Sequence, residues 1–189
     1  MSEIFVFAGC NGSGKSTLAN RLLSSIQPAP EFVNADIIAA QLNPNDVEAV
    51  AITASRLMLN RLKVLAASGA DFAFETTLAA RTFARFLRDC RHEDYNINLI
   101  YVWLESPELA VSRVARRVAS GGHNIPQDII KRRYQRSLKN LVELYLPLAD
   151  RFQAYDNSHD ENSLIAYYSN HNNPITIIQP DIWNQILKT

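Results

Sequence analysis

The stretch FAGCNGSGKST, residues 7–17, has glycines at positions 9, 12 and 14, followed by a lysine and two hydroxyl side chains. The apolar run 3–8 predicts a buried strand before it, and residues 15–26 have the pattern of a helix after it. A flexible loop therefore joins a strand directly to the head of a helix. In this position glycines let successive backbone N–H groups converge on one point, where the helix N-terminus adds partial positive charge. The stretch predicts a cradle for an anion.

The spacing within this loop is specific. Four residues separate Gly9 from Gly14. Lys15 and Ser16 follow directly, so the loop fits the phosphate-binding pattern G-x-x-x-x-G-K-[S/T]. We expect Lys15 to reach the β- and γ-phosphates of ATP, and the Ser16 hydroxyl to ligate Mg²⁺. A glycine-rich turn without a ligand is the alternative, which the strand-loop-helix context disfavours. The residues expected to bind ATP are Gly9, Asn11, Gly12, Ser13, Gly14, Lys15, Ser16 and Thr17.

The composition is that of an ordinary globular protein, with 47% hydrophobic residues, 20% charged residues and zero formal net charge. A neutral chain predicts no general attraction to nucleic acid or to an anionic membrane. No run is long and apolar enough to predict a transmembrane segment or a signal peptide. Cys10 and Cys90 match no metal or redox spacing, so both are expected to be reduced thiols. These features favour a cytoplasmic protein without a membrane partner.

Short apolar runs alternate with longer helical patterns, which is typical of a sheet covered by helices on both faces. Further strands are expected at 31–36, 71–76 and 97–104, and in the tail near 152–155, 164–168 and 175–178. Further helices are expected at 46–68, at 81–92, from Ser106 and Pro107 onward, between 126 and about 146, and around Trp183. No linker or repeat divides the chain. Residues 1–189 are therefore expected to form one α/β domain, the three-layer α/β/α fold of a P-loop NTPase with a mainly parallel sheet.

Two acidic residues stand where predicted strands end. Asp36 closes the second predicted strand and Glu75 closes the third. Ligands collect outside the carboxyl ends of the strands in an open parallel sheet, so both carboxylates are expected to border one cleft. Phosphoryl transfer to a hydroxyl needs a general base, and Asp36 is the candidate, while Glu75 would hold the acceptor or a water on the metal. A helix N-cap is the alternative role for Asp36.

Basic residues concentrate between positions 113 and 139, a region we interpret as a helical, arginine-rich lid. They are Arg113, Arg116, Arg117, Lys131, Arg132, Arg133, Arg136 and Lys139. On a helical wheel most of them lie opposite two apolar stripes, and a Gly-Gly pair at 121–122 supplies a hinge. Closure would carry arginines onto the transferring phosphoryl group. A solvated surface and a nucleic-acid patch are the alternatives. Nucleic acid is disfavoured because Tyr134 is the only aromatic residue among the arginines, and it belongs to an apolar stripe.

Several segments together resemble a known family. They are the phosphate loop, NAD at 34–36, ETTL at 75–78, YDNS at 155–158 and SPELAVSRVARRVASGGHNIPQDIIKRRYQRSLKNL at 106–141. In these segments the chain resembles the zeta toxin-like family of P-loop kinases, specifically its short bacterial branch often labelled predicted ABC-type ATPase. Zeta toxins use ATP to phosphorylate the amino-sugar 3′-hydroxyl of UDP-N-acetylglucosamine. The resemblance runs from about residue 3 to about residue 158.

The resemblance implies roles for individual catalytic residues. Asp36 would be the base, and Lys15 and Ser16 would hold the ATP–Mg complex. Arg117 and Arg133 would be the pair that stabilises charge on the transferring phosphoryl group. The helical wheel alone does not select these two arginines from the eight basic residues.

The acceptor is expected to bind at Glu75, Thr76 and His123. For His123, which lies in the hinge of the lid, a purely local hydrogen-bonding role is the alternative. The resemblance also makes an antitoxin protein a candidate partner. The predicted function is an ATP-dependent kinase whose acceptor is a small hydroxylated metabolite, such as the nucleotide sugar UDP-N-acetylglucosamine. The alternative is an ATPase switch or a nucleic-acid-associated ATPase without a small-molecule acceptor.

Overall fold

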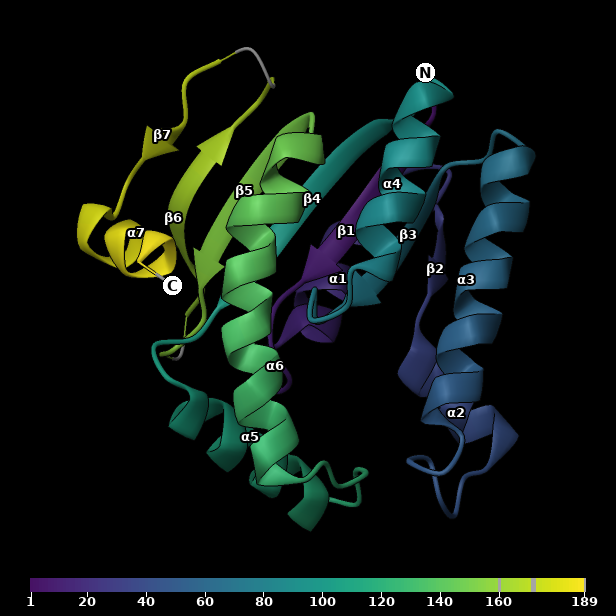
Figure 1. Ribbon diagram of the computed structural model, residues 1–189, viewed down its shortest axis with the longest axis vertical. Helices are drawn as coiled ribbons and strands as arrows, with labels where there is room; N and C mark the ends of the chain where they lie inside the picture. The colour runs from purple at the N-terminus through teal and green to yellow at the C-terminus, as the bar shows by residue number, and fades with distance from the viewer. Residues whose placement is uncertain (160, 171–172, 189) are drawn as a thin grey trace.

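Seven strands form one sheet in the computed structural model, which describes residues 1–159, 161–170 and 173–188. The strands are β1 (Glu3–Ala8), β2 (Glu31–Val33), β3 (Phe72–Thr76), β4 (Asn96–Trp103), β5 (Arg151–Asp156), β6 (Ser163–Tyr168) and β7 (Thr176–Ile177). They lie in the order β2-β3-β1-β4-β5-β6-β7 (Figure 1). The first five strands pair in parallel, and β6 and β7 add to the edge in antiparallel fashion. The prediction of a mainly parallel sheet is confirmed.

The middle one of the five parallel strands is β1, which pairs with β3 on one side and β4 on the other. Val6 is aligned with Phe74 and with Leu99, and all three side chains are buried. Strands buried on both faces read as near-continuous apolar runs, which is why this part of the sheet was recognisable in the sequence. The pairing also aligns Ala8 with Thr76. The carboxyl ends of β1 and β3 therefore lie side by side.

Helices cover the sheet on both faces. They are α1 (Lys15–Leu23), α2 (Ala35–Leu42), α3 (Ala51–Ala67), α4 (Thr82–His92), α5 (Pro107–Ala119), α6 (Gln127–Asn140) and α7 (Pro180–Leu187). Figure 1 shows α3, α4 and α6 in front of the sheet and α1 behind it. The larger hydrophobic cluster fills the front interface, and a smaller one around Phe7, Leu18 and Ile100 lies under α1. The three-layer α/β/α fold is confirmed. Within the described part of the chain, no helix has the length and apolar character to cross a membrane.

The segment after β2 differs from the prediction. Instead of a strand over 31–36, the strand ends at Val33 and α2 begins at Ala35. The Asn34 side-chain oxygen accepts a hydrogen bond from the backbone N–H of Asp36 (2.8 Å), which is the N-cap geometry that starts a helix. Asp36 therefore lies in the first turn of α2, and the N-cap role considered for it belongs to Asn34.

Three helix boundaries also differ from the prediction, the first because α1 ends at Leu23 and not at residue 26. The helix expected over 46–68 begins only at Ala51, after a series of turns. The helix expected to reach about residue 146 leaves α-helical geometry after Asn140 and continues as a π-helical turn (Leu141–Tyr145) and a 3₁₀ turn (Leu146–Leu148). A proline in the second turn lacks the N–H that would continue a helix. The start of α5, with its capping serine and following proline, and the three tail strands agree with the prediction.

A strained turn follows β3. Leu78 has a φ of +56° and a fully buried side chain. The Leu78 N–H donates to the Thr76 hydroxyl (3.1 Å), and the Asn140 side-chain amide donates to the Leu78 carbonyl oxygen (2.7 Å). A left-handed conformation is unfavourable for leucine, so burial and these two hydrogen bonds hold the turn in place.

Replacing Asn140 with alanine is expected to lower the free energy of unfolding by about 1–3 kcal/mol, because the buried Leu78 carbonyl loses its donor. Urea unfolding followed by circular dichroism measures this change. Asn60→Ala, at an exposed position of α3, is the matched control and should stay within about 0.5 kcal/mol of the wild type. Equal losses in both variants would contradict the assigned role of Asn140.

Candidate active site

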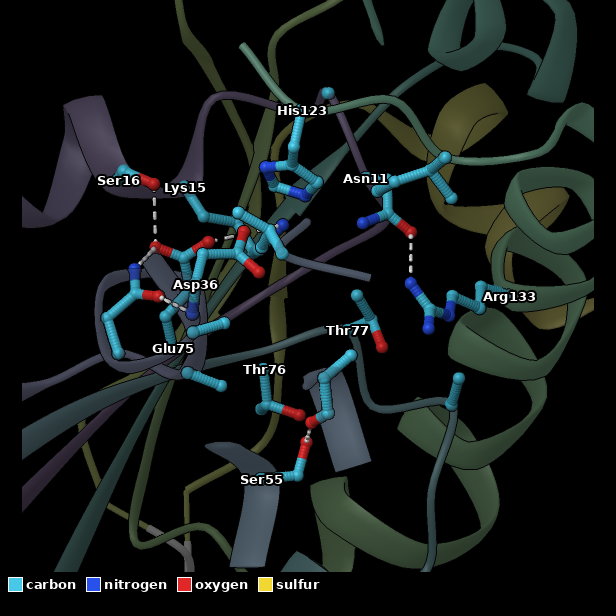
Figure 2. Close-up of a pocket in the computed structure, with 18 of the residues that line it drawn as sticks. Asn11, Lys15, Ser16, Asp36, Ser55, Glu75, Thr76, Thr77, His123 and Arg133 are labelled. Atoms are coloured by element: carbon cyan, nitrogen blue, oxygen red, sulfur yellow. Dashed lines mark hydrogen bonds and ion pairs between the residues drawn. The ribbon is translucent and has the colours of Figure 1, made fainter. Parts of the chain in front are cut away.

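A cleft of about 680 Å³ opens at the carboxyl ends of β1 and β3 (Figure 2). The loop between β1 and α1 lines its phosphate end, α2 and α3 contribute one wall, and the lid formed by α5 and α6 contributes another. The predicted site residues that line the cleft are Asn11, Gly12, Gly14, Lys15, Ser16, Thr17, Asp36, Glu75, Thr76, Arg117, His123 and Arg133. The fold thus brings together side chains that the sequence distributes over four separate segments.

Gly9 and Ser13, also predicted to bind ATP, lie behind the lining of the cleft. Gly9 has a φ of +143°, and a Cβ at this position would stand 2.2 Å from the carbonyl oxygen of Val102. Only glycine fits so close to β4. Ser13 is fully buried, and its backbone N–H donates to the Cys10 carbonyl oxygen (3.3 Å). Gly9 and Ser13 therefore support the conformation of the loop on the side away from the cleft.

Lys15 is only 6% exposed although its side chain is charged. Its Nζ donates to the Cys10 carbonyl oxygen (2.8 Å) and lies 3.6 Å from Glu75 Oε1. A buried ammonium requires such partners, because removing an unpaired charge from water is costly. Helix α1 begins at Lys15, and its N-cap Gly14 adopts the left-handed conformation with a φ of +90°. The ammonium and the positive end of the helix therefore adjoin the same part of the cleft, which suits phosphate groups.

Both cysteines are free and buried, as expected. Burial raises the pKa of the Cys10 thiol to about 11, although the nearby charge of Lys15 acts in the opposite direction. Burial likewise raises the pKa of the Cys90 thiol to about 12. Both thiols are therefore protonated at neutral pH, and a protonated thiol is a poor nucleophile.

Glu75, at the end of β3, is bonded to the phosphate loop. Ser16 Oγ donates to Glu75 Oε2 (2.7 Å), and Asn34 Nδ2 donates to the same oxygen (3.0 Å), as Figure 2 shows. Mg²⁺ prefers oxygen ligands and is usually held by one or two carboxylates together with substrate phosphates. The Ser16 hydroxyl and the Glu75 carboxylate meet this requirement. They form a donor set that fits a Mg²⁺ ion bound to nucleotide phosphates.

Asp36 is placed in the cleft by the start of α2. Its backbone N–H donates to the side-chain oxygen of Asn34 (2.8 Å), and the residue is exposed. In Figure 2 the Asp36 side chain lies on the same side of the cleft as Lys15, whereas Arg133 lies on the opposite side. A carboxylate beside the phosphate loop can accept a proton from a hydroxyl group that enters the cleft.

Arg117, at the end of α5, is enclosed by the hinge of the lid. Its Nη2 donates to the backbone carbonyl oxygen of His123 (3.2 Å) and lies 3.5 Å from the imidazole Nε2. A Cβ added to Gly122 would stand 2.7 Å from Arg117 Cγ, so the hinge glycine allows this close approach. Among the described residues, Arg117 Nε has no hydrogen-bond partner although it is buried. His123 thus contributes to the position of Arg117 as well as to the lining of the cleft.

Five arginines of the lid line the cleft in the described structure. They are Arg113, Arg117, Arg132, Arg133 and Arg136. Arg133 Nη1 approaches Asn11 Oδ1 of the phosphate loop at 3.5 Å (Figure 2). The two lysines of the lid instead pair with acids away from the cleft, Lys131 with Glu108 (2.9 Å) and Lys139 with Glu143 (3.8 Å). The lid therefore adds positive charge to the cleft through its arginines and not through its lysines.

Some residues of the cleft escaped prediction from the sequence. The opposite wall carries Ala51, Ser55 and Met58 of α3 and Phe83 of α4. Their spacing on α3 is helical, which by itself is equally consistent with packing against a core. In the sequence, Asn34 stands out only as part of the segment NAD at 34–36. An asparagine directly before an apolar helical pattern is a helix N-cap signal, which could have indicated the start of α2.

The fold and the site together define a class. A mainly parallel sheet, a glycine-rich loop at the head of α1 and a buried lysine in that loop are the features of a nucleotide-binding protein with a P-loop kinase-like fold.

The chain belongs to the family described as "AAA domain", whose model matches residues 4–143. The matched segment contains the phosphate loop, Asp36, Glu75 and the lid. An uncharacterized protein of Haemophilus influenzae is 30% identical over 133 residues, which cover 70% of this chain and 93% of that protein.

Solved structures show the same fold at low sequence identity. The complex AvrRxo1-ORF1:-ORF2 with ATP has a TM-score of 0.78 and 14% identity over 98% of this chain, which spans 63% of the length of that chain. The PezAT chromosomal toxin-antitoxin system of Streptococcus pneumoniae has a TM-score of 0.65 and 15% identity, covering 99% of this chain and 83% of that chain. A gluconokinase from Sinorhizobium meliloti has a TM-score of 0.54 and 16% identity, covering 84% and 83%. These neighbours include kinases, in agreement with the P-loop kinase-like fold.

Replacing Lys15 with alanine is expected to weaken binding of Mg·ATP at least about tenfold, because the phosphates lose their buried cation. Isothermal titration calorimetry measures the dissociation constant directly. Lys63→Ala removes an equivalent charge from an exposed position of α3 and should leave affinity unchanged. Unaltered ATP affinity in the Lys15 variant would contradict the assignment of the phosphate loop.

Proposed function

We propose that the protein is an ATP-dependent kinase that transfers the γ-phosphoryl group of ATP to a hydroxyl of a small metabolite, and that the acceptor is a nucleotide sugar of the UDP-N-acetylglucosamine type. The position of Asp36 is the observation that carries this proposal. Asp36 lines the same cleft as the phosphate loop, beside Lys15 and across from Arg133. A switch that hydrolyses ATP needs only a residue that positions water, whereas transfer to a metabolite also needs room and a wall for the acceptor, which α2 and α3 supply in this cleft.

The proposed reaction uses the residues as follows. Asp36 accepts the proton of the acceptor hydroxyl, the oxygen of that hydroxyl attacks the γ-phosphorus, and ADP leaves. Lys15 and the amides of the loop hold the phosphates in place. Arg117 and Arg133 neutralise the charge that spreads over the transferring group. Mg²⁺ bound at Ser16 and Glu75 would supply further positive charge at the phosphates.

The acceptor would bind between the phosphate loop and the wall formed by α3. The polar residues Thr76, Ser55 and Glu48 line the cleft together with the apolar residues Met58 and Phe83. Polar and apolar groups side by side suit a ligand that has both hydroxyl groups and a planar or methylated portion. A nucleotide sugar meets that description.

An antitoxin protein is part of the same proposal. The fold neighbour from Streptococcus pneumoniae is described as a toxin-antitoxin system, and the AvrRxo1 neighbour is a complex of two chains named ORF1 and ORF2. We propose that a cognate antitoxin binds this chain as well. Co-expression with the product of an adjacent gene, followed by size-exclusion chromatography, would detect such a complex.

Replacing Asp36 with asparagine is expected to lower the rate of phosphoryl transfer about 10²–10⁴-fold, with little change in ATP affinity, because only proton acceptance is lost. The assay incubates the protein with labelled ATP and a panel of nucleotide sugars and identifies phosphorylated products by mass spectrometry. Asp181→Asn, an exposed position in α7, is the control. Full transfer by the Asp36 variant would exclude this residue as the base, and ATP hydrolysis without any phosphorylated acceptor would favour the ATPase switch.

Replacing Arg117 or Arg133 with alanine is expected to lower kcat by roughly 10²-fold and to change ATP affinity much less, because their charge acts mainly on the transition state. Arg116→Ala, on the exposed side of α5, is the matched control. Steady-state kinetics with varied ATP separates the two parameters. A loss of affinity as large as the loss of kcat would count against a role in charge stabilisation.

A further inference from the structure

We propose that Asn157 is a positioning residue for phosphate binding, because its side-chain amide fixes the orientation of the peptide between Ser13 and Gly14. Asn157 follows β5 and lies outside the segment, residues 4–143, that matches the family model. The proposal rests on nucleotide binding by the phosphate loop and is independent of which acceptor the enzyme uses.

The contact with the loop is short and direct. Asn157 Nδ2 donates to the carbonyl oxygen of Ser13 at 2.7 Å. The same nitrogen would stand 2.5 Å from a Cβ added to Gly14. The amide therefore packs against the backbone of the loop at the residue that caps α1. Gly14 is required here for two reasons, its left-handed conformation and the presence of the Asn157 side chain.

The geometry of a peptide unit explains how this hydrogen bond reaches the ligand. The carbonyl of Ser13 and the N–H of Gly14 belong to one planar unit and point in opposite directions when the peptide is trans. Because Asn157 holds the carbonyl from behind the loop, the N–H of Gly14 is directed away from Asn157. Gly14 lines the cleft whereas Ser13 is fully buried, so this N–H is directed to the side on which phosphate oxygens would lie. A hydrogen bond at the carbonyl also polarises the unit and makes its N–H a stronger donor.

Asn157 can act in this way because its own backbone is firmly anchored. Its N–H donates to the carbonyl oxygen of Trp103 at the end of β4 (3.1 Å). The neighbouring Asp156 carboxylate accepts from the backbone N–H of Ser158 (2.8 Å), which closes a tight turn. Ser158 Oγ accepts from the N–H of Glu105 (2.9 Å).

The turn at 156–158 is also joined to the lid. Arg113 Nη2, from α5, donates to the carbonyl oxygen of Ser158 (3.1 Å). Arg113 and Gly14 both line the cleft. The turn thus connects β4, the lid and the phosphate loop, and Asn157 supplies its contact with the loop.

The test uses Asn157→Ala and Asn157→Leu, which both remove the amide donor. Alanine leaves a gap beside the loop, whereas leucine is close to asparagine in size. Calorimetry with Mg²⁺ present measures the affinity of the full chain for ATP, for inorganic tripolyphosphate and for adenosine. Both variants are expected to lose about tenfold in affinity for ATP and for tripolyphosphate, with adenosine affinity unchanged. Asn60→Ala and Asn60→Leu, exposed on α3, are the matched controls and should bind all three ligands as the wild type does.

The ligand series separates a positioning role from the alternatives. If Asn157 contacted the base, affinity for ATP and adenosine would fall and affinity for tripolyphosphate would remain, which overturns the proposal. Unchanged affinity for all three ligands in folded variants overturns it as well. Circular dichroism and thermal unfolding establish folding at the assay temperature. If both variants unfold there, Asn157 acts by holding the fold together and the proposal fails. Absence of kinase activity in a wild-type protein that binds ATP normally would contradict the proposed reaction and leave the proposed role of Asn157 intact.

Discussion

A lysine ammonium buried at the carboxyl edge of the sheet is the interaction on which the rest of the site depends. The charge of Lys15 is balanced by a loop carbonyl and by Glu75. Glu75 is held in turn by Ser16 and by Asn34. Asn34 also caps α2 and thereby places Asp36. The Asn34 side chain therefore contacts both Glu75 and the start of α2, the helix that carries the proposed base.

The lid illustrates how one amphipathic helix serves both stability and chemistry. On the inner face of α6, the Tyr134 hydroxyl donates to the Leu104 carbonyl oxygen (2.7 Å), and Ser137 bonds to the buried hydroxyl of Tyr101 (3.1 Å). Burial keeps the pKa of the Tyr134 phenol far above its usual value, so this tyrosine remains a neutral donor. With the inner face fixed to the end of β4, the outer arginines are presented to the cleft as a set. The two lysines of the same lid form ion pairs with Glu108 and Glu143, and neither lysine lines the cleft.

Prediction from the sequence succeeded where a local pattern was sufficient and failed where a contact between distant segments decided the outcome. The phosphate loop was recognisable because its function depends on consecutive backbone groups and on fixed glycine positions. The start of α5 was recognisable for the same reason, since its cap lies three residues from the N–H it serves. The segment 31–36 was read as a strand because its apolar residues fit either state. The side-chain oxygen of Asn34 caps α2 locally, whereas the bond of its amide to Glu75, 41 positions away, has no local signal in the sequence.

By itself the sequence determined the order of strands and helices apart from α2, the phosphate loop, the concentration of arginines in the lid and the two acids that line the cleft. Each of these follows from neighbouring residues, whose periodicity and spacing obey short-range rules of backbone geometry and burial. Only the tertiary structure decided that Glu75 is bonded to the phosphate loop, that Arg117 is enclosed by its own hinge and that Asn157 donates to the Ser13 carbonyl oxygen. These arrangements join residues up to 144 positions apart, as Asn157 and Ser13 show. The physical reason is that such contacts arise from the packing of the parallel sheet, which no local pattern encodes.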